Sequence, residues 1–416
     1  MNLSKSRSGL RRLAVSMCWS GALLLCLTNP AQAAPPSTLA QALDAAWQRT
    51  QAGAAAEGQQ LRARAEQYAA DSWLAASPAL TLSQRDDRWQ GKHGAQEREV
   101  GIVLPLRLPG QRASNQAASQ AEIGVAELTL TLTRLQLAGQ LRELAWSLAS
   151  LQAESRAAQT QSSYLQAVSL DVERRVLSGD LAPSDAMAAQ GERLAAAAEA
   201  LAAAQRLQAE RLRWTSLTGL AADDVDASEV PRAGNGAFSA ESHPALALAT
   251  QAVELARRQA EVAFGNNRDA PELNLGYRSD RSEFGQASQG SLVIGLRLPL
   301  GNDARNKPLQ AVAQSALDSA LAEQTRLRLT LAAEQAAAVG AVQAAMAQIE
   351  LQRQRASLLH QRRDLIEKSF QAGQSALPDL LLAGHSAAQA DVDLARQTAA
   401  LGAAQARLLQ SEGALP

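Results

Sequence analysis

The feature that most constrains the fold of this chain is an internal duplication with a constant offset of 194 residues (295 minus 101). Gly101-Ile-Val-Leu-Pro-Leu106 aligns with Gly295-Leu-Arg-Leu-Pro-Leu300 at this offset. Three single positions repeat it in the same order: Gly179 with Gly373, Asp185 with Asp379, and Gly219 with Gly413. Because these matches share one offset and one order, the chain contains two copies of a single unit.

The duplication divides the chain into four parts. We expect a signal peptide at residues 1–33, a first repeat at 38–220 and a second repeat at 241–414. Residues 221–240 carry acidic side chains, a proline and a Gly-Asn-Gly sequence, a composition typical of a linker. The period far exceeds that of solenoid repeats, so each copy is a domain-sized element.

Each repeat shows the same order of expected elements: a helix, two strands joined by a polar loop, a very long helix, a short break and a last helix. The first helices are expected at 39–73 and 244–264, and the long ones at about 112–177 and 308–372. The strands are expected at 79–88, 98–108, 272–281 and 290–300. At about 1.5 Å per residue, each long helix would span on the order of 100 Å.

The expected strands alternate apolar and polar residues, which is the period of a sheet with two unlike faces. We expect one face to meet lipid through these side chains: Val100, Ile102, Leu104, Leu292, Ile294 and Leu296. By pattern alone, an ordinary half-buried hairpin fits as well. After the expected signal peptide, no apolar run reaches the length of roughly 18 residues that a membrane-spanning helix needs, so no transmembrane helix is visible.

The N-terminus has the three regions of a secretory signal. Basic residues lead into the mostly apolar stretch Leu13–Leu27, and Ala31-Gln32-Ala33 matches the cleavage pattern. An uncleaved anchor helix is the alternative. Cleavage would remove both cysteines, Cys18 and Cys26, so the mature chain would have no disulfide and no thiolate metal site. Leu25 precedes Cys26 where lipoprotein signals have a small residue, which disfavours lipidation and leaves it open.

Composition argues against several classes of function. The formal net charge of -1 gives no support for nucleic-acid binding, which usually shows as a basic patch or domain. The sequence shows no catalytic arrangement and no phosphate-binding loop, so we expect no enzyme and no cofactor. The four histidines, His93, His243, His360 and His385, stand in no metal-ligand spacing, and we expect each at the surface.

Four strands cannot close a barrel in lipid, because each unpaired backbone group at an open edge costs several kcal/mol. If the strands cross a membrane, closure must come from several chains. Three chains would supply about 12 strands, a number within the known range of such barrels.

Together these features resemble the outer-membrane efflux protein family typified by TolC. The resemblance covers nearly the whole mature chain. It implies a mainly α fold with a membrane β-barrel portion, in which a duplicated helix–β-hairpin–long helix–helix unit gives a long antiparallel helical barrel plus four strands per chain, completed as a homotrimer. It also implies an outer-membrane location with the helical barrel in the periplasm.

The two helix breaks carry part of this resemblance. Gly179 and Gly373 fit helix ends that need a left-handed backbone, and Asp185, Pro378 and Asp379 stand where the next helix starts. The first break departs from the family pattern in having its proline early. The resemblance implies that these residues form the periplasmic tip that contacts the adaptor. A purely structural turn is an equal alternative.

The expected function is passive export through the outer membrane. The resemblance implies three partners: outer-membrane lipid, a periplasmic adaptor (membrane fusion protein) and an inner-membrane pump of the resistance-nodulation-division type. The sequence Leu104-Pro-Leu-Arg-Leu-Pro-Gly-Gln-Arg112 is more similar to the cobalt–zinc–cadmium branch, which implies heavy-metal cations as substrates. Alternatives are a drug or type I protein-secretion duct of the same fold, a periplasmic adaptor, or a coiled-coil envelope protein.

Overall fold

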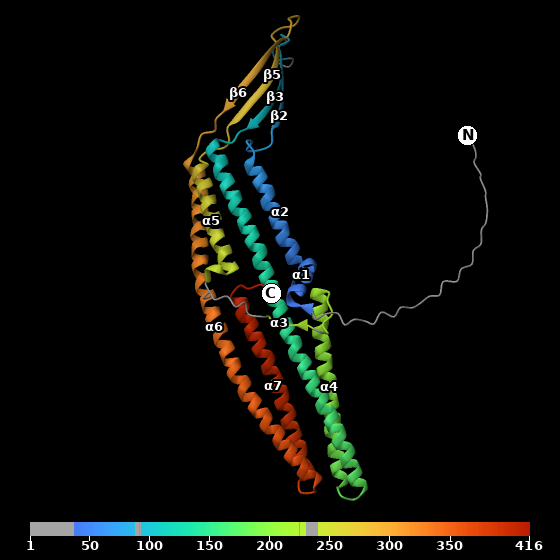
Figure 1. Cartoon of the computed structure of the whole chain (residues 1–416). Helices are drawn as coiled ribbons and strands as arrows, with labels where there is room; N and C mark the ends of the chain where they lie inside the picture. Colours follow the sequence, from blue (N-terminus) through green and yellow to red (C-terminus); the bar gives the residue numbers. More distant parts are fainter. Residues whose placement is uncertain (1–36, 88–90, 92, 224, 230–239) are drawn as a thin grey trace, which may run out of the picture. The chain divides into compact units, whose positions relative to one another are not determined.

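The computed structural model describes residues 37–87, 91, 93–223, 225–229 and 240–416; the expected signal peptide lies outside them. Within the described residues, seven α-helices extend from one end of a small sheet (Figure 1). The helices are α1 (Leu39–Arg49), α2 (Gln51–Asp71), α3 (Pro109–Leu177), α4 (Pro183–Thr218), α5 (Pro244–Gly265), α6 (Asp303–Gln371) and α7 (Leu377–Ser411). A short 3-10 helix, η1 (Ala240–Ser242), precedes α5.

The two long helices, α3 and α6, each have 69 residues. At the α-helical rise, each is on the order of 100 Å long. Both begin earlier than the sequence predicted. Pro109 is tolerated at the start of α3 because the first backbone N–H groups of a helix have no partner within it. The helix α6 begins before Pro308, since the Asn302 side chain caps it by accepting a hydrogen bond from the Ala304 N–H at 2.8 Å.

The prediction of one helix over residues 39–73 was wrong, because Thr50 has an extended backbone and separates α1 from α2. The first turn of α2 packs closely against the end of α1. A Cβ at Gly53 would lie 2.6 Å from the carbonyl oxygen of Trp47, so only glycine fits this approach.

The four strands of the main sheet are β2 (Ala79–Asp86), β3 (Gln96–Pro105), β5 (Glu272–Arg281) and β6 (Gln289–Arg297). Their order is β2-β3-β5-β6, and every neighbouring pair is antiparallel. The central β3–β5 pair joins the first half of the chain to the second. Of the strands that the structure describes, β2 and β6 form the two edges of this sheet.

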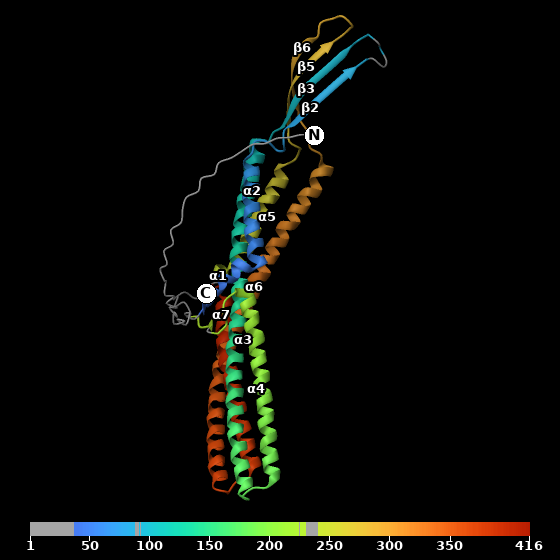
Figure 2. The ribbon, with the colours of Figure 1, turned by 90° about the vertical axis from the view of Figure 1, so that its right-hand side faces the viewer.

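The helices form two side-by-side arrangements that share α3 and α6. Nearest the sheet, the contacts follow the order α2–α3–α5–α6, and farther away they follow α4–α3–α7–α6 (Figures 1 and 2). Thus α6 lies along one edge throughout, and α2 and α4 lie along the other. Two turns, residues 178–182 and 372–376, join the helices at the end opposite the sheet; we call them the tip turns.

A second, two-stranded sheet was not predicted. β1 (Ser37–Thr38) pairs in parallel with β4 (Val225–Asp226), which brings the start of the described chain against the segment after α4. The adjacent core contains Leu141 and Leu148 of α3 and the fully buried Trp214 of α4. These contacts attach part of the segment that composition marks as a linker to the helices.

Candidate functional site

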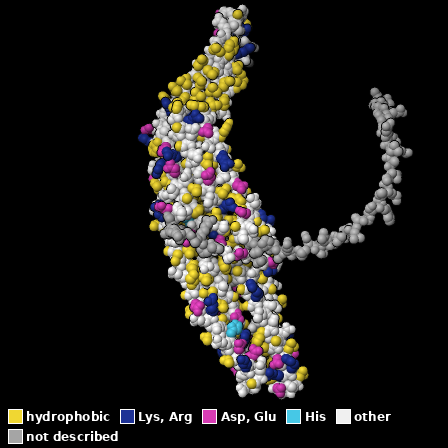
Figure 3. Space-filling model, in the orientation of Figure 1, with side chains coloured by type: hydrophobic (Ala, Val, Ile, Leu, Met, Phe, Trp, Pro, Cys, Tyr) yellow, Lys and Arg dark blue, Asp and Glu magenta, His cyan; other side chains and the backbone are white. Residues whose placement is uncertain are grey.

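The strand register gathers the apolar side chains of all four strands on one face of the sheet. Cross-strand partners in an antiparallel pair point to the same face, so the pairings define rows. The three rows are Leu82–Val100–Tyr277–Leu292, Leu80–Ile102–Leu275–Ile294 and Leu104–Leu273–Leu296. Most of these side chains are exposed, and Figure 3 shows hydrophobic side chains gathered over the sheet. We call this surface the apolar belt.

The opposite face of the sheet is polar. Arg278 on β5 pairs with Glu97 and Glu99 on β3, at 3.0 and 2.9 Å. Arg297 on β6 pairs with Glu272 on β5 at 3.2 Å. The sheet therefore presents an apolar surface on one side and ion pairs on the other, without a hydrophobic core on either. An ordinary half-buried hairpin would cover its apolar face with the rest of its own chain.

The tip turns share one backbone conformation. Gly179 has φ +84° and Gly373 has φ +75°, which confirms the left-handed backbone predicted for both. In the first turn, Gly179 N–H donates to Val176 O and Asp180 N–H to Arg175 O, at 3.1 and 2.8 Å. The second turn repeats this pattern at matching residues. Nothing lies within 4 Å of a Cβ built on either glycine, so the backbone alone requires them.

The helices after the tip turns begin before their aspartates. The N-caps of α4 and α7 are Ala182 and Ala376, and both aspartates lie three residues later, in the first helical turn. Each aspartate therefore lies at the start of its helix, as the sequence predicted, three residues after the N-cap itself. The Asp185 carboxylate instead accepts a hydrogen bond from the Ala182 N–H at 3.2 Å. Pro378 lies in the first turn of α7, where a missing N–H costs no hydrogen bond.

A small hydrophobic cluster holds the two tip turns together. Val172 of α3, Phe370 of α6 and Leu380 of α7 are buried in it, with Ala189 of α4. Arg175 adds a polar link, since its Nη1 donates to the Phe370 carbonyl at 3.1 Å and its guanidinium lies 4.9 Å from the ring centroid. The end of the molecule opposite the sheet is therefore a packed unit rather than two separate hairpins.

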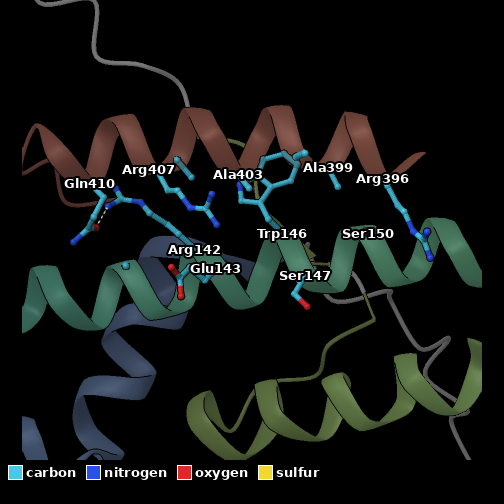
Figure 4. Close-up of a pocket in the computed structure, with 13 residues that line it drawn as sticks. Arg142, Glu143, Trp146, Ser147, Ser150, Arg396, Ala399, Ala403, Arg407 and Gln410 are labelled. Atoms are coloured by element: carbon cyan, nitrogen blue, oxygen red, sulfur yellow. Dashed lines mark hydrogen bonds between the residues drawn. The ribbon is translucent and has the colours of Figure 1, made fainter. Parts of the chain in front are cut away.

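A cavity of about 430 Å³ lies between α3 and α7 (Figure 4). Trp146 of α3 points towards α7, where Gly402 leaves room for its ring. At one end the buried Arg142 donates to both carboxylate oxygens of Glu229, at 2.8 and 3.0 Å, and also to Gln410. Sequence reasoning missed this cluster, because its members are far apart in the chain and belong to no motif.

The histidines follow the prediction only in part. His93 is exposed and His360 contacts Asp391 at 2.7 Å, while His385 lines a groove between α4 and α7. His243 is buried, which contradicts the expected surface position. Its Nδ1 accepts a hydrogen bond from the Ala245 N–H at 3.1 Å and thus caps α5. Burial lowers the pKa of His243.

The described residues contain neither a membrane-spanning helix nor a cluster of metal ligands. None of their helices is long and apolar enough to cross a membrane. Among the same residues, no group of three or more His, Cys, Asp or Glu side chains is placed to hold a metal ion.

Comparison with known proteins establishes the fold and shows which family the chain is similar to. The family model for outer membrane efflux protein matches residues 239–414. The cobalt-zinc-cadmium resistance protein CzcC of Cupriavidus metallidurans is 25% identical over 210 residues, which are 49% of this chain and 50% of that protein. The chain therefore matches about half the length of this curated relative.

Solved structures match over most of the chain. The outer membrane protein VceC of Vibrio cholerae has a TM-score of 0.70 at 17% identity, covering 90% of this chain and 96% of its own. The CmeC outer membrane channel of Campylobacter jejuni has a TM-score of 0.72 at 12% identity, with coverages of 90% and 85%. CusC has a TM-score of 0.73 at 16% identity, with coverages of 90% and 92%. At these identities the likeness establishes the fold.

Proposed function

We propose that this chain, whose residues 239–414 match the model of the outer membrane efflux protein family, is the outer-membrane duct of a tripartite efflux system. Its place is the outer membrane, with the helices in the periplasm. The single observation that carries the proposal is the sheet with an exposed apolar belt on one face and ion pairs on the other. Such a sheet suits lipid outside and water inside.

Closure of the duct requires further copies of the chain. The edge strands β2 and β6 would leave rows of unpaired backbone groups in the hydrocarbon, at several kcal/mol for each group. Pairing β6 of one copy with β2 of the next removes both edges. Three copies then form a sheet of about 12 strands, so the functional unit is a homotrimer.

The partners of the duct follow from its two ends. The apolar belt meets outer-membrane lipid, and the tip turns, with Gly179, Asp185, Gly373, Pro378 and Asp379, dock to a periplasmic adaptor. The adaptor connects the duct to an inner-membrane pump of the resistance-nodulation-division type, which supplies the energy. The equal length and the shared backbone pattern of the two tip turns within one chain support a common docking role for both.

Heavy-metal cations are the proposed substrates. Support comes from the relative CzcC, which is named for cobalt, zinc and cadmium resistance and matches half of this chain. A deletion strain should lose tolerance to at least one of cobalt, zinc or cadmium, and the intact gene should restore it. Unchanged tolerance to all three metals, with new sensitivity to antibiotics, would assign the duct to drug export instead.

A further inference from the structure

Two arginines on the apolar side of the main sheet differ from those on its polar face. On the polar face, Arg278 and Arg297 are each paired with glutamates. Arg98 of β3 and Arg281 of β5 belong to the opposite face, because even numbers of residues separate them from the belt members of their own strands. Within the part of the chain that the structure describes, neither of these two forms an ion pair.

The register places both arginines just beyond the apolar belt, at the end of the sheet farthest from the helices. The last row of the belt contains Val100 and Tyr277, Arg98 lies in the next row, and Arg281 lies one row farther. Successive rows are about 6.6 Å apart along the strands. Because Arg98 pairs with Ser279, it is a diagonal neighbour of Arg281, at about 7–8 Å. Figure 3 shows basic side chains at this end of the sheet, beyond the hydrophobic ones.

Tyr277 links the last row of the belt to the first row of arginines. Its side chain is 55% exposed. A Cβ at Gly290 would collide with the Tyr277 hydroxyl, and Gly290 belongs to the same row as Arg98. The ring therefore starts in the belt and its hydroxyl reaches the next row. Tyrosines with an apolar body and a hydroxyl in a polar row are typical of the boundary between membrane hydrocarbon and headgroups.

The groups around the two guanidinium groups leave them able to bind an anion. Arg98 is exposed, and the described residues offer it no hydrogen bond. Arg281 donates one N–H to the Gly94 carbonyl at 3.4 Å, which leaves most of its five donors available. Among the described residues of these two rows, Asp86 is the only carboxylate, and it already accepts a hydrogen bond from the side chain of Gln96. Two positive charges therefore face one negative charge.

We propose that Arg98 and Arg281, with the Tyr277 hydroxyl, bind a phosphate group on the headgroup of a phosphorylated glycolipid in the outer leaflet of the outer membrane. The site rests on the proposed function, which turns the belt towards lipid and the helices towards the periplasm, and so places these arginines at the outer headgroups. A guanidinium binds phosphate through two parallel hydrogen bonds. The adjoining belt contacts the acyl chains of the same molecule, which favours a lipid over a free anion.

Binding of lipid A to the purified trimer tests the site. The trimer in phosphatidylcholine nanodiscs is titrated with fluorescent lipid A that carries two phosphates. Arg98→Gln should weaken binding at least threefold, and the variant that also carries Arg281→Gln at least tenfold. The matched control is Arg85→Gln, which removes an arginine from the same end of the sheet but from its polar face. Its affinity should stay within about twofold of wild type.

The possible failures are distinguishable. Equal affinity of the wild type and the double variant would overturn the site, as would equal binding of lipid A from which the phosphates have been removed. Inorganic phosphate at millimolar concentration should not displace lipid A; displacement would show a site for free anions instead.

Wild-type trimers that do not bind lipid A would overturn the site and leave the duct in place, whereas a wild-type chain without trimers in membranes would overturn both proposals. If the double variant does not assemble, the two single variants decide, and equal affinity of Arg98→Gln and Arg85→Gln overturns the site.

Discussion

Replacing Ile294 with arginine should prevent assembly of the membrane sheet. Ile294 is 75% exposed and belongs to the middle row of the apolar belt, opposite Leu275. The rows on either side lie two residues away, which is about 6.6 Å along the strand. Ile294 is therefore the apolar position of β6 nearest the centre of the belt, where a charge meets the most hydrocarbon.

The expected penalty is large because the change occurs in every copy. An arginine at the bilayer midplane of a membrane sheet costs about 2–4 kcal/mol, so three copies would lose about 6–12 kcal/mol. That loss is comparable with the whole stability of a typical domain, about 5–15 kcal/mol. We therefore expect little or no heat-resistant trimer in outer-membrane fractions.

The control for this experiment is the neighbouring residue. Val293 points to the polar face and pairs with Gly276, so Val293→Arg places the same charge on the same strand towards water. It should leave the amount of trimer within about twofold of wild type, because a charge in the aqueous interior carries no comparable penalty. Equal assembly of both arginine variants would show that the apolar belt does not face lipid.

Three further predictions concern the helices. Gly373→Val should cost about 1–2 kcal/mol, because the backbone at this position is left-handed, and it should reduce crosslinking to the adaptor while the amount of trimer stays normal. The control, Gly58→Val in α2, also has no close neighbours and should leave crosslinking intact; full crosslinking in both variants would refute adaptor docking at the tip. Glu229→Ala removes the carboxylate that pairs with the buried Arg142 and should lower the free energy of unfolding by about 3–5 kcal/mol in urea titrations, a prediction that a change under about 1 kcal/mol contradicts. Burial lowers the pKa of His243 below its ordinary 6.5, so the unfolded chain binds more protons than the folded chain, and the free energy of unfolding should fall as pH drops below about 6.5. His243→Asn should keep the helix cap and flatten this part of the plot of unfolding free energy in urea against pH; an unchanged slope would exclude His243 as its source.

The two faces of the sheet were predictable from the sequence, because they depend on the alternation of neighbouring residues along each strand. Strict alternation in β5 and β6 specifies which side chains share a face, and the repeat indicates that β2 and β3 do the same. The left-handed glycines were predictable for a similar reason, since a helix that ends at Gly179 or Gly373 needs a residue without a Cβ penalty. The break between α1 and α2 at Thr50 was not predictable, because no proline marks it. Only the folded structure, in which Trp47 packs on Gly53, accounts for it.

The duplication, the two faces of the strands and the approximate extent of α3 and α6 follow from the amino-acid sequence, because repeats, periodicity and helix breaks depend on neighbouring residues. Which elements lie side by side depends on contacts that form only in the folded chain. The fold pairs β3 with β5, places α4 and α6 at opposite edges, and brings Arg142, Glu229 and Gln410 together. These contacts join residues that are far apart in the chain. Their energies depend on how the whole chain packs, which no pattern of neighbouring residues reveals.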